Sequence, residues 1–481
     1  MNSSIKSKTV NGFKWGLIDN LANSGVTFIV GLVLANLLMP EEFGILGIIT
    51  IFINLSITLI DGGLATALIR KKDVSELEYN TVFYANLSVS IILMLFLFLG
   101  SNYIAAFFDQ PILAPTLSVM CLVLLINTLS LIPKTILIKK IDFKSQAIFS
   151  LIASLLSGGV GVVMAYNGCG VWALVGQQLL RQMLMAIGFW CVCRWHPRFL
   201  FSIECFKDLF GFGSKLLAAN VVNSLFKDAF LAVIGKIYSA KDLGFYNRAE
   251  QFNAILSNNM GQIVRKVSLP TLSQIQDEEE RLRETFRKLM IYVGIISFAA
   301  VFSLFAISEP LVVILIGEKW LPSVGLLRIM CFYAAIYPLN MLNLNLLNVR
   351  KRSDYLLKLE IIKKILFLPV IGVGFFFNIE VMLWVAVVYY YVEFFINGWY
   401  SYRLIGYGTK AQVKDMGGIY FISLVIALAT YLLTLLSLPA YIILILQLLV
   451  LGSLFIVTYR VLKQPEYMEI ENFCKSKIIS K

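Results

Sequence analysis

Apolar segments of about 20 residues, separated by short charged or turn-forming breaks, follow one another along almost the whole chain. A helix of that length is what the hydrocarbon core of a bilayer requires. Hydrophobic residues make up 59% of the 481 residues and charged residues only 15%. A soluble domain has about a quarter charged residues. The sequence therefore predicts an all-α integral membrane protein.

Fourteen segments are predicted to span the membrane. No small-residue cleavage site follows the first of them, so we expect it to act as an uncleaved insertion signal. The predicted spans are 12–38, 45–69, 79–101, 112–134, 144–166, 170–193, 207–236, 244–268, 284–307, 323–348, 354–377, 380–404, 416–436 and 440–463.

The basic residues indicate how these spans are oriented. Of 41 Lys and Arg, 31 fall in the even-numbered loops and the two tails, whereas the odd-numbered loops hold only Lys241 and Lys319. Basic residues stay on the cytoplasmic side during insertion. We therefore expect both termini in the cytoplasm. Topology then explains the net charge of +12, and no nucleic-acid partner is expected.

A shift of 200 residues aligns the first predicted span with the seventh and places the turn PEEFG (40–44) over AKDLG (240–244). Six spans, an even number, separate the two helices, which predicts a parallel internal repeat. We expect a two-lobe bundle with an N-lobe at 1–195 (helices 1–6) and a C-lobe at 196–405 (helices 7–12). Helices 13–14 and a cytoplasmic tail follow at 406–481.

The two aligned helices carry polar side chains at the spacing i, i+3, i+4, i+7, which places each set on one helix face. A polar stripe is costly in hydrocarbon, so it should face the bundle interior or water. The alternative is a contact between helices, because Asn and Ser hydrogen-bond across membrane helices. A lysine in the second stripe favours a shared central cavity. The stripes are Asn20, Asn23, Ser24 and Thr27, and Asn220, Asn223, Ser224 and Lys227.

Further charged residues at membrane depth add candidates for this cavity. Arg181 shares a helix face with Gln178, which suits a bidentate phosphate, although a structural bridge to an aspartate is the alternative. Glu360, Lys363 and Lys364 form a set that can neutralise itself. Lys215 and Arg248 complete the candidate substrate-binding residues. The candidate ion-coupling residues are Asp19, Asp61, Asp228 and Glu393.

Motifs for catalysis are missing from the sequence. It contains no G-x-x-x-x-G-K-[ST] phosphate loop, no nucleophile elbow and no H-E-x-x-H pair. The seven cysteines and the single His196 lack the spacing of a metal site. We therefore expect a transporter without a cofactor or a metal.

Five stretches carry a resemblance to a known family. The chain resembles the polysaccharide-transporter branch of the MOP superfamily, and most of all the Wzx-type flippases of the colanic and teichuronic acid group. The similarity covers about residues 8–405. The stretches are EEFGILG (41–47), DGGLATALIRKKD (61–73), LGFYNRAEQF (243–252), SLPTLSQIQDE (268–278) and IGEKWLPSVGLLRIM (316–330).

The resemblance implies a carrier in the bacterial inner membrane. It would move undecaprenyl-pyrophosphate-linked oligosaccharide by alternating access, with the polysaccharide polymerase and chain-length proteins as partners. A MATE-type exporter of drugs or organic cations is the alternative on the same fold, and acidic residues in the cleft would favour it. A membrane enzyme that joins sugars is a third, more distant alternative.

Overall fold

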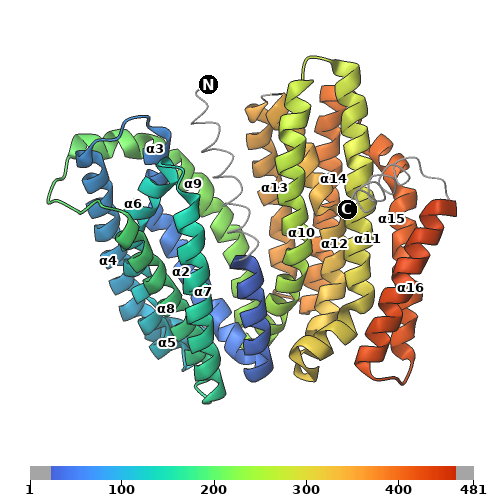
Figure 1. The fold of residues 1–481 in the computed structure, drawn as a ribbon, viewed down its shortest axis with the longest axis horizontal. Coiled ribbons are helices and arrows are strands. Elements are labelled where there is room, and N and C mark those ends of the chain that lie inside the picture. Colours follow the sequence, from blue (N-terminus) through green and yellow to red (C-terminus); the bar gives the residue numbers. More distant parts are fainter. Residues whose placement is uncertain (1–22, 351, 462–481) are drawn as a thin grey trace. The chain divides into compact units, whose positions relative to one another are not determined.

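The computed structural model describes residues 23–350 and 352–461, and every regular element among them is a helix. The chain divides into two compact units, Met1–Gly244 and Phe245–Lys481. Figure 1 labels the helices used below. The sequence expectation of an all-α membrane bundle is confirmed.

Ten helical elements lie wholly within unit 1 among the described residues. They are the helix Asn23–Leu37, α2 (Pro40–Asp61), α3 (Leu64–Arg70), α4 (Glu76–Phe107), α5 (Leu113–Met120), α6 (Leu122–Lys139), α7 (Phe143–Tyr166), α8 (Val171–Val192), α9 (Ile203–Val233) and the π-helix η1 (Ile234–Tyr238).

Helix α10 (Ala240–Gln274) begins in unit 1 and continues into unit 2. The other elements of unit 2 are α11 (Glu279–Ile316), η2 (Glu318–Trp320), α12 (Leu321–Val349), α13 (Ser353–Val373), α14 (Ile379–Ile405), α15 (Thr409–Tyr431), η3 (Leu432–Leu435) and α16 (Ala440–Val461).

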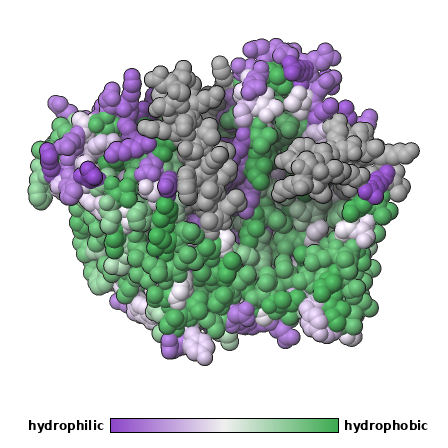
Figure 2. Space-filling model, in the orientation of Figure 1, coloured by the Kyte–Doolittle hydropathy of each residue, from purple (hydrophilic) through white to green (hydrophobic). Residues whose placement is uncertain are grey.

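Among the described residues, ten helices are long and apolar enough to cross a membrane. On the visible face of each unit, apolar side chains form a broad band (Figure 2). The predicted number of fourteen spans is not confirmed by this measure. Helices α8, α10 and α13 coincide with three further predicted spans, and Asn23–Leu37 covers part of the first.

The predicted span 45–69 is divided into α2 and α3 by a pair of glycines. Gly62 and Gly63 have φ angles of 55° and 73°, in the left-handed region that side chains with a Cβ rarely adopt. The chain therefore turns between Asp61 and Leu64, and α3 leaves the axis of α2. This break gives the wall of the site described below a short helix of its own.

The two turns aligned by the 200-residue repeat lie against each other. A Cβ on Gly44 would overlap the carbonyl oxygen of Ala240, and a Cβ on Gly244 would overlap that of Pro40. Each glycine is thus four residues into its helix and meets the first residue of the other helix. Only glycine allows backbones to approach so closely. The reciprocal contact supports the repeat and its offset.

Both helix starts also use an acidic residue three positions after the cap, through different hydrogen bonds. The carboxylate of Glu42 accepts a hydrogen bond from the backbone N–H of Met39 at 2.7 Å. At the related position, the backbone N–H of Asp242 donates to Ser239 Oγ at 2.9 Å, and that hydroxyl donates to the Asp242 carboxylate at 2.6 Å. An acidic residue three positions after the cap therefore stabilises both helix starts.

Unit 2 is held together by apolar packing and by buried amides. Phe286, Phe298 and Phe302 of α11 are fully buried. Asn397 of α14 donates to Asn340 of α12 at 3.0 Å, and Ser401 donates to Asn343 at 2.7 Å. Such side chains connect membrane helices because lipid offers them no partner.

Candidate functional site

A cavity of about 760 Å³ lies within unit 1, between α2 and α3, α6, α8 and α9. Its wall is unusually polar for a membrane bundle. Among the described residues that line it, Lys134 and Arg181 are the cations and Asp61 is the carboxylate. Amides and hydroxyls make up the rest of the polar lining: Thr58, Asn127, Ser130, Thr135, Gln178, Gln182, Asn220, Asn223 and Ser224.

Helical spacing explains how α6 and α8 present these groups. On α6, Asn127, Ser130 and Lys134 follow one another at i, i+3 and i+7, which places them on one face. On α8, Gln178, Arg181 and Gln182 follow at i, i+3 and i+4, which also places them on one face. Each helix therefore turns one polar stripe to the cavity.

The Arg181 guanidinium is oriented by the helix Asn23–Leu37. It donates a hydrogen bond to Asn23 Oδ1 at 3.1 Å. The same oxygen accepts from the Ser154 hydroxyl of α7 at 2.5 Å. Asn23 therefore contacts a residue that lines the cavity, and its side-chain carbonyl group connects three helices.

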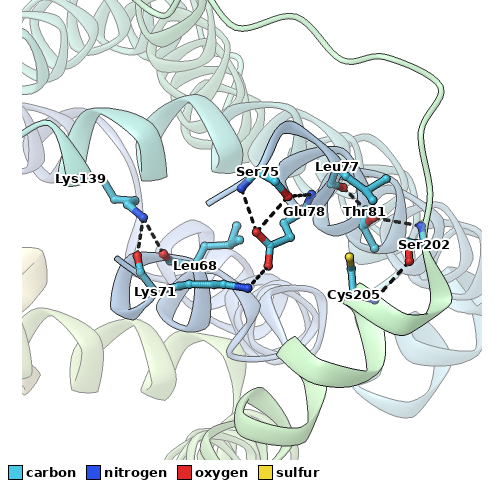
Figure 3. Close-up of polar contacts among 9 residues, drawn as sticks. All are labelled: Leu68, Lys71, Ser75, Leu77, Glu78, Thr81, Lys139, Ser202 and Cys205. Atoms are coloured by element: carbon cyan, nitrogen blue, oxygen red, sulfur yellow. Dashed lines mark hydrogen bonds and ion pairs between the residues drawn. The ribbon is translucent and has the colours of Figure 1, made fainter. Parts of the chain in front are cut away.

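Helix α3 forms part of the cavity wall through Ala65 and Ile69. Its C-terminal end is held by Lys139, whose ammonium donates to the carbonyl oxygens of Leu68 at 3.2 Å and Lys71 at 2.6 Å (Figure 3). A cation at the last carbonyls of a helix satisfies groups that have no partner within the helix. Lys139 therefore fixes the position of this wall.

A second contact ties the end of α3 to the start of α4. Glu78 pairs with the Lys71 ammonium, and it also accepts from the Ser75 backbone N–H at 2.9 Å (Figure 3). The Glu78 backbone N–H donates to Ser75 Oγ at 3.3 Å, which completes a capping box. The hydrogen bond with Glu78 raises the pKa of Lys71.

Helix α9 packs directly on the α2–α3 turn. A Cβ on Gly213 would lie 2.8 Å from the Gly62 carbonyl oxygen, and a Cβ on Gly63 would lie 2.6 Å from the carbonyl oxygen of Gly213. Further along, the hydroxyls of Thr58 and Ser224 lie 3.4 Å apart. The two helices therefore run antiparallel, and their contact forms one edge of the cavity.

The polar stripe predicted on the seventh helix is divided by this packing. Asn220, Asn223 and Ser224 line the cavity, whereas Lys227 is exposed and lies outside it, as does Lys215. The cavity lining contributed by α9 ends at Ser224. The cations predicted from α9 are therefore replaced in this cavity by Lys134 and Arg181.

The remaining candidates in unit 1 have other surroundings. Asp61 lines the cavity, but Asp228 is buried outside it, and its Oδ2 has no hydrogen-bond partner among the described residues. Ser24 and Thr27 do not line the cavity. Asp19 and Asn20 lie outside the described residues.

Two candidates belong to unit 2. Arg248 is buried, donates to Gln251 at 2.5 Å and lies over the ring of Trp320 at 5.1 Å. Glu393 of α14 pairs with Lys363 of α13 at 2.8 Å.

The sequence predicts that Glu360, Lys363 and Lys364 of α13 neutralise one another. This set does not account for the main partner of Lys363. The distance from Lys363 to Glu360 is 4.0 Å, so the closer carboxylate comes from the neighbouring helix. A cation bound by Glu393 would have to displace this ammonium.

Lys134 is the charged cavity residue that sequence reasoning missed, and the uncharged lining residues Thr58, Asn127, Ser130, Thr135 and Gln182 were missed with it. The position of Lys134 at the end of an apolar run, near a basic loop, places it with the residues that set topology. The signal was nevertheless present, because Asn127, Ser130 and Lys134 form a polar stripe on an otherwise apolar helix.

Comparison with known proteins decides the family. The family described as "Polysaccharide biosynthesis protein" matches residues 33–325, which is more than half of the chain. The chain belongs to this family. The resemblance to the polysaccharide-transporter branch of the MOP superfamily is thereby confirmed.

The chain is identical to relatives of known name at about a quarter of the aligned positions. It is 27% identical to the lipopolysaccharide biosynthesis protein WzxC of Escherichia coli over 377 residues, 77% of this chain and 76% of the relative. It is 26% identical to the teichuronic acid biosynthesis protein TuaB of Bacillus subtilis, with 73% of each chain covered.

Solved structures confirm the fold. The lipid II flippase MurJ, in an inward closed conformation, matches with a TM-score of 0.72 at 14% identity, over 94% of this chain and all of the other. An inward-facing MATE multidrug transporter of the MOP superfamily matches with a TM-score of 0.60 at 16% identity, over 80% and 94%. The protein is a multi-pass membrane protein with a MATE-like fold.

Proposed function

We propose that this protein is a flippase for lipid-linked oligosaccharide. It moves undecaprenyl-pyrophosphate-linked repeat units across the bacterial cytoplasmic membrane by alternating access, for cell-surface polysaccharide synthesis. The observation that carries the proposal is the cavity in unit 1, where Lys134 and Arg181 stand among amides and hydroxyls. Relatives named for lipopolysaccharide and teichuronic acid synthesis, and for succinoglycan transport, support it.

The chemistry of the cavity fits a phosphorylated sugar. A diphosphate cannot cross hydrocarbon unless its charge is matched, and a guanidinium binds two phosphate oxygens at once. With two cations and one carboxylate, the lining has a net charge of +1. The amides and hydroxyls offer both donors and acceptors to sugar hydroxyls. The lipid tail does not need to enter the cavity.

The alternatives fit this lining less well. An exporter of organic cations would place acidic groups around its substrate, and among the described lining residues Asp61 is the only one. An enzyme that joins sugars would need catalytic motifs that the sequence lacks. We therefore favour transport of an anionic, hydroxyl-rich headgroup.

We further propose that the basic end of unit 1 faces the cytoplasm. This end gathers the C-terminal ends of α3 and α6 and the start of α4, with Arg70, Lys71, Lys72, Lys139 and Lys140. Basic residues are retained on that side of the membrane. The polysaccharide polymerase and chain-length proteins are the partners that would receive the exported units.

Deletion of the gene in its host tests the function. Lipid-linked repeat units should accumulate, remain on the cytoplasmic side and disappear when the wild-type gene is restored. The Arg181→Ala variant should be inserted in the membrane but fail to restore export. Normal surface glycan in the deletion strain, without accumulation of the lipid-linked unit, would overturn the proposal.

A further inference from the structure

The connection between α8 and α9, residues 193–202, has no regular secondary structure, yet it is held firmly. We call it the strap. Its Arg198 backbone N–H donates to Asn80 Oδ1 at 2.6 Å, and its Ser202 N–H donates to Thr81 Oγ1 at 3.1 Å. Asn80 and Thr81 are fully buried in α4. The strap is the loop at the edge of unit 1, beside the start of α4 (Figure 1), and Figure 3 shows the bond from Ser202 to Thr81.

The strap turns large apolar side chains outward. The side chain of Phe199 is 96% exposed, that of Phe201 is 54% exposed, and that of Ile203, the first residue of α9, is 63% exposed. The Phe199 ring nevertheless has a defined place, because it stacks on Tyr84 at 5.7 Å. Large apolar side chains that are exposed on a segment held in place indicate a surface that an apolar medium or partner covers.

Basic side chains flank these apolar groups. Arg194, within the strap, and Lys207, in the first turns of α9, are both exposed. Arg198 is exposed as well and pairs with Glu76 at 2.9 Å. Over residues 193–208, three basic residues outnumber the two exposed acidic residues Glu204 and Asp208, so the strap and the start of α9 combine outward aromatic rings with a small excess of positive charge.

We propose that the strap is an interfacial anchor on an anionic lipid surface. Phe199, Phe201 and Ile203 enter the boundary between headgroups and acyl chains, while Arg194 and Lys207 contact lipid phosphates. Aromatic residues concentrate at that depth, and basic residues close to a leaflet are attracted to anionic headgroups.

The buried side chains of Asn80 and Thr81 explain how a segment without regular secondary structure can lie at the membrane interface. Backbone N–H groups that face lipid need a partner from the protein. Asn80 and Thr81 supply it to Arg198 and Ser202, so these donors remain satisfied at the edge of the bilayer. A strap that faced bulk water would not need buried partners, because water would serve.

The anchor also has a consequence for the cavity. The strap joins α8 to α9, and both helices line the cavity. A strap held at the lipid phosphates fixes the ends of these helices at the depth of the headgroups. The inference does not depend on which substrate is carried.

Fluorescence quenching of the full-length protein in nanodiscs tests the position of the strap. The variant Phe199→Trp adds one indole to the seven native tryptophans. The emission of this added indole is obtained by subtracting the emission of the parent protein from that of the variant. Lipids brominated near the top of the acyl chain should quench most of this added emission, and aqueous iodide should quench little of it. Quenching by iodide and not by brominated lipid would overturn the proposal, and so would protection from both, which would indicate a protein partner.

Thermal unfolding tests the choice of lipid. Replacing phosphatidylcholine by phosphatidylglycerol in the nanodisc should raise the Tm of the parent. The double variant Arg194→Gln, Lys207→Gln should lose a measurable part of this rise. The variant Lys410→Gln, an exposed lysine of unit 2, is the control and should keep it. An equal rise in all three proteins would contradict the contact with anionic phosphates.

Discussion

Gly213 offers the sharpest test of how α9 packs on the cavity wall. Its Cβ position lies 2.8 Å from the Gly62 carbonyl oxygen, whereas ordinary contacts begin at 3.4 Å. In Gly213→Ala the two backbones must therefore separate by about 0.6 Å, the difference between these distances. Overpacking of this kind costs about 1–3 kcal/mol. Alanine also favours a helix by about 1 kcal/mol relative to glycine, which offsets part of that cost.

Gly211, two residues earlier on the same helix, provides the matched control. A Cβ there meets no heavy atom within 4 Å, so Gly211→Ala should gain the helix propensity of about 1 kcal/mol without a clash. The difference in unfolding free energy between the two variants isolates the contact and should be about 1–3 kcal/mol. Thermal unfolding in nanodiscs measures both variants. If Gly213→Ala stabilised the protein as much as Gly211→Ala, the close contact of α9 with the α2–α3 turn would be refuted.

Substitutions at three further contacts extend these tests. Gly44→Ala should impair transport and lower the Tm, because its Cβ overlaps a backbone carbonyl; a fully active, stable variant would contradict the reciprocal contact of the repeats. Glu393→Ala leaves the buried ammonium of Lys363 without its closest carboxylate, which should cost about 3 kcal/mol in thermal unfolding; an unchanged Tm would show that the pair is not formed. Glu78→Gln should lower stability by about 1 kcal/mol, whereas Glu76→Gln, in an exposed pair, should change it little; equal effects would contradict the assigned burial.

Much of the fold follows from local patterns. Apolar runs long enough to span a bilayer indicate a helical membrane bundle wherever they pack. The offset of 200 residues can be recognised in the sequence because both related positions, 44 and 244, must be glycine where the starts of α2 and α10 are in backbone contact. The stripe of Asn220, Asn223 and Ser224 shares one face because helix geometry alone determines it.

Other features depend on packing that no local pattern contains. Lys227 continues the stripe of α9, but the cavity lining from this helix ends at Ser224, and Lys227 lies outside it. Lys363 has a carboxylate on its own helix and a closer one on α14, and only the tertiary structure selects between them. Lys134 looks like a topology signal until α6 is seen to line a cavity with that face.

The most direct test of the central proposal is flipping by the purified protein in proteoliposomes. The probe is a polyprenyl diphosphate carrying a fluorescent sugar, and dithionite added outside destroys the fluorescence of the outer leaflet. Wild-type protein and the Lys215→Gln variant should bring the whole probe within reach of dithionite. The Lys134→Gln, Arg181→Gln double variant should leave the inner-leaflet portion protected. If the double variant flipped the probe at the wild-type rate, these two cations would have no part in carrying the headgroup.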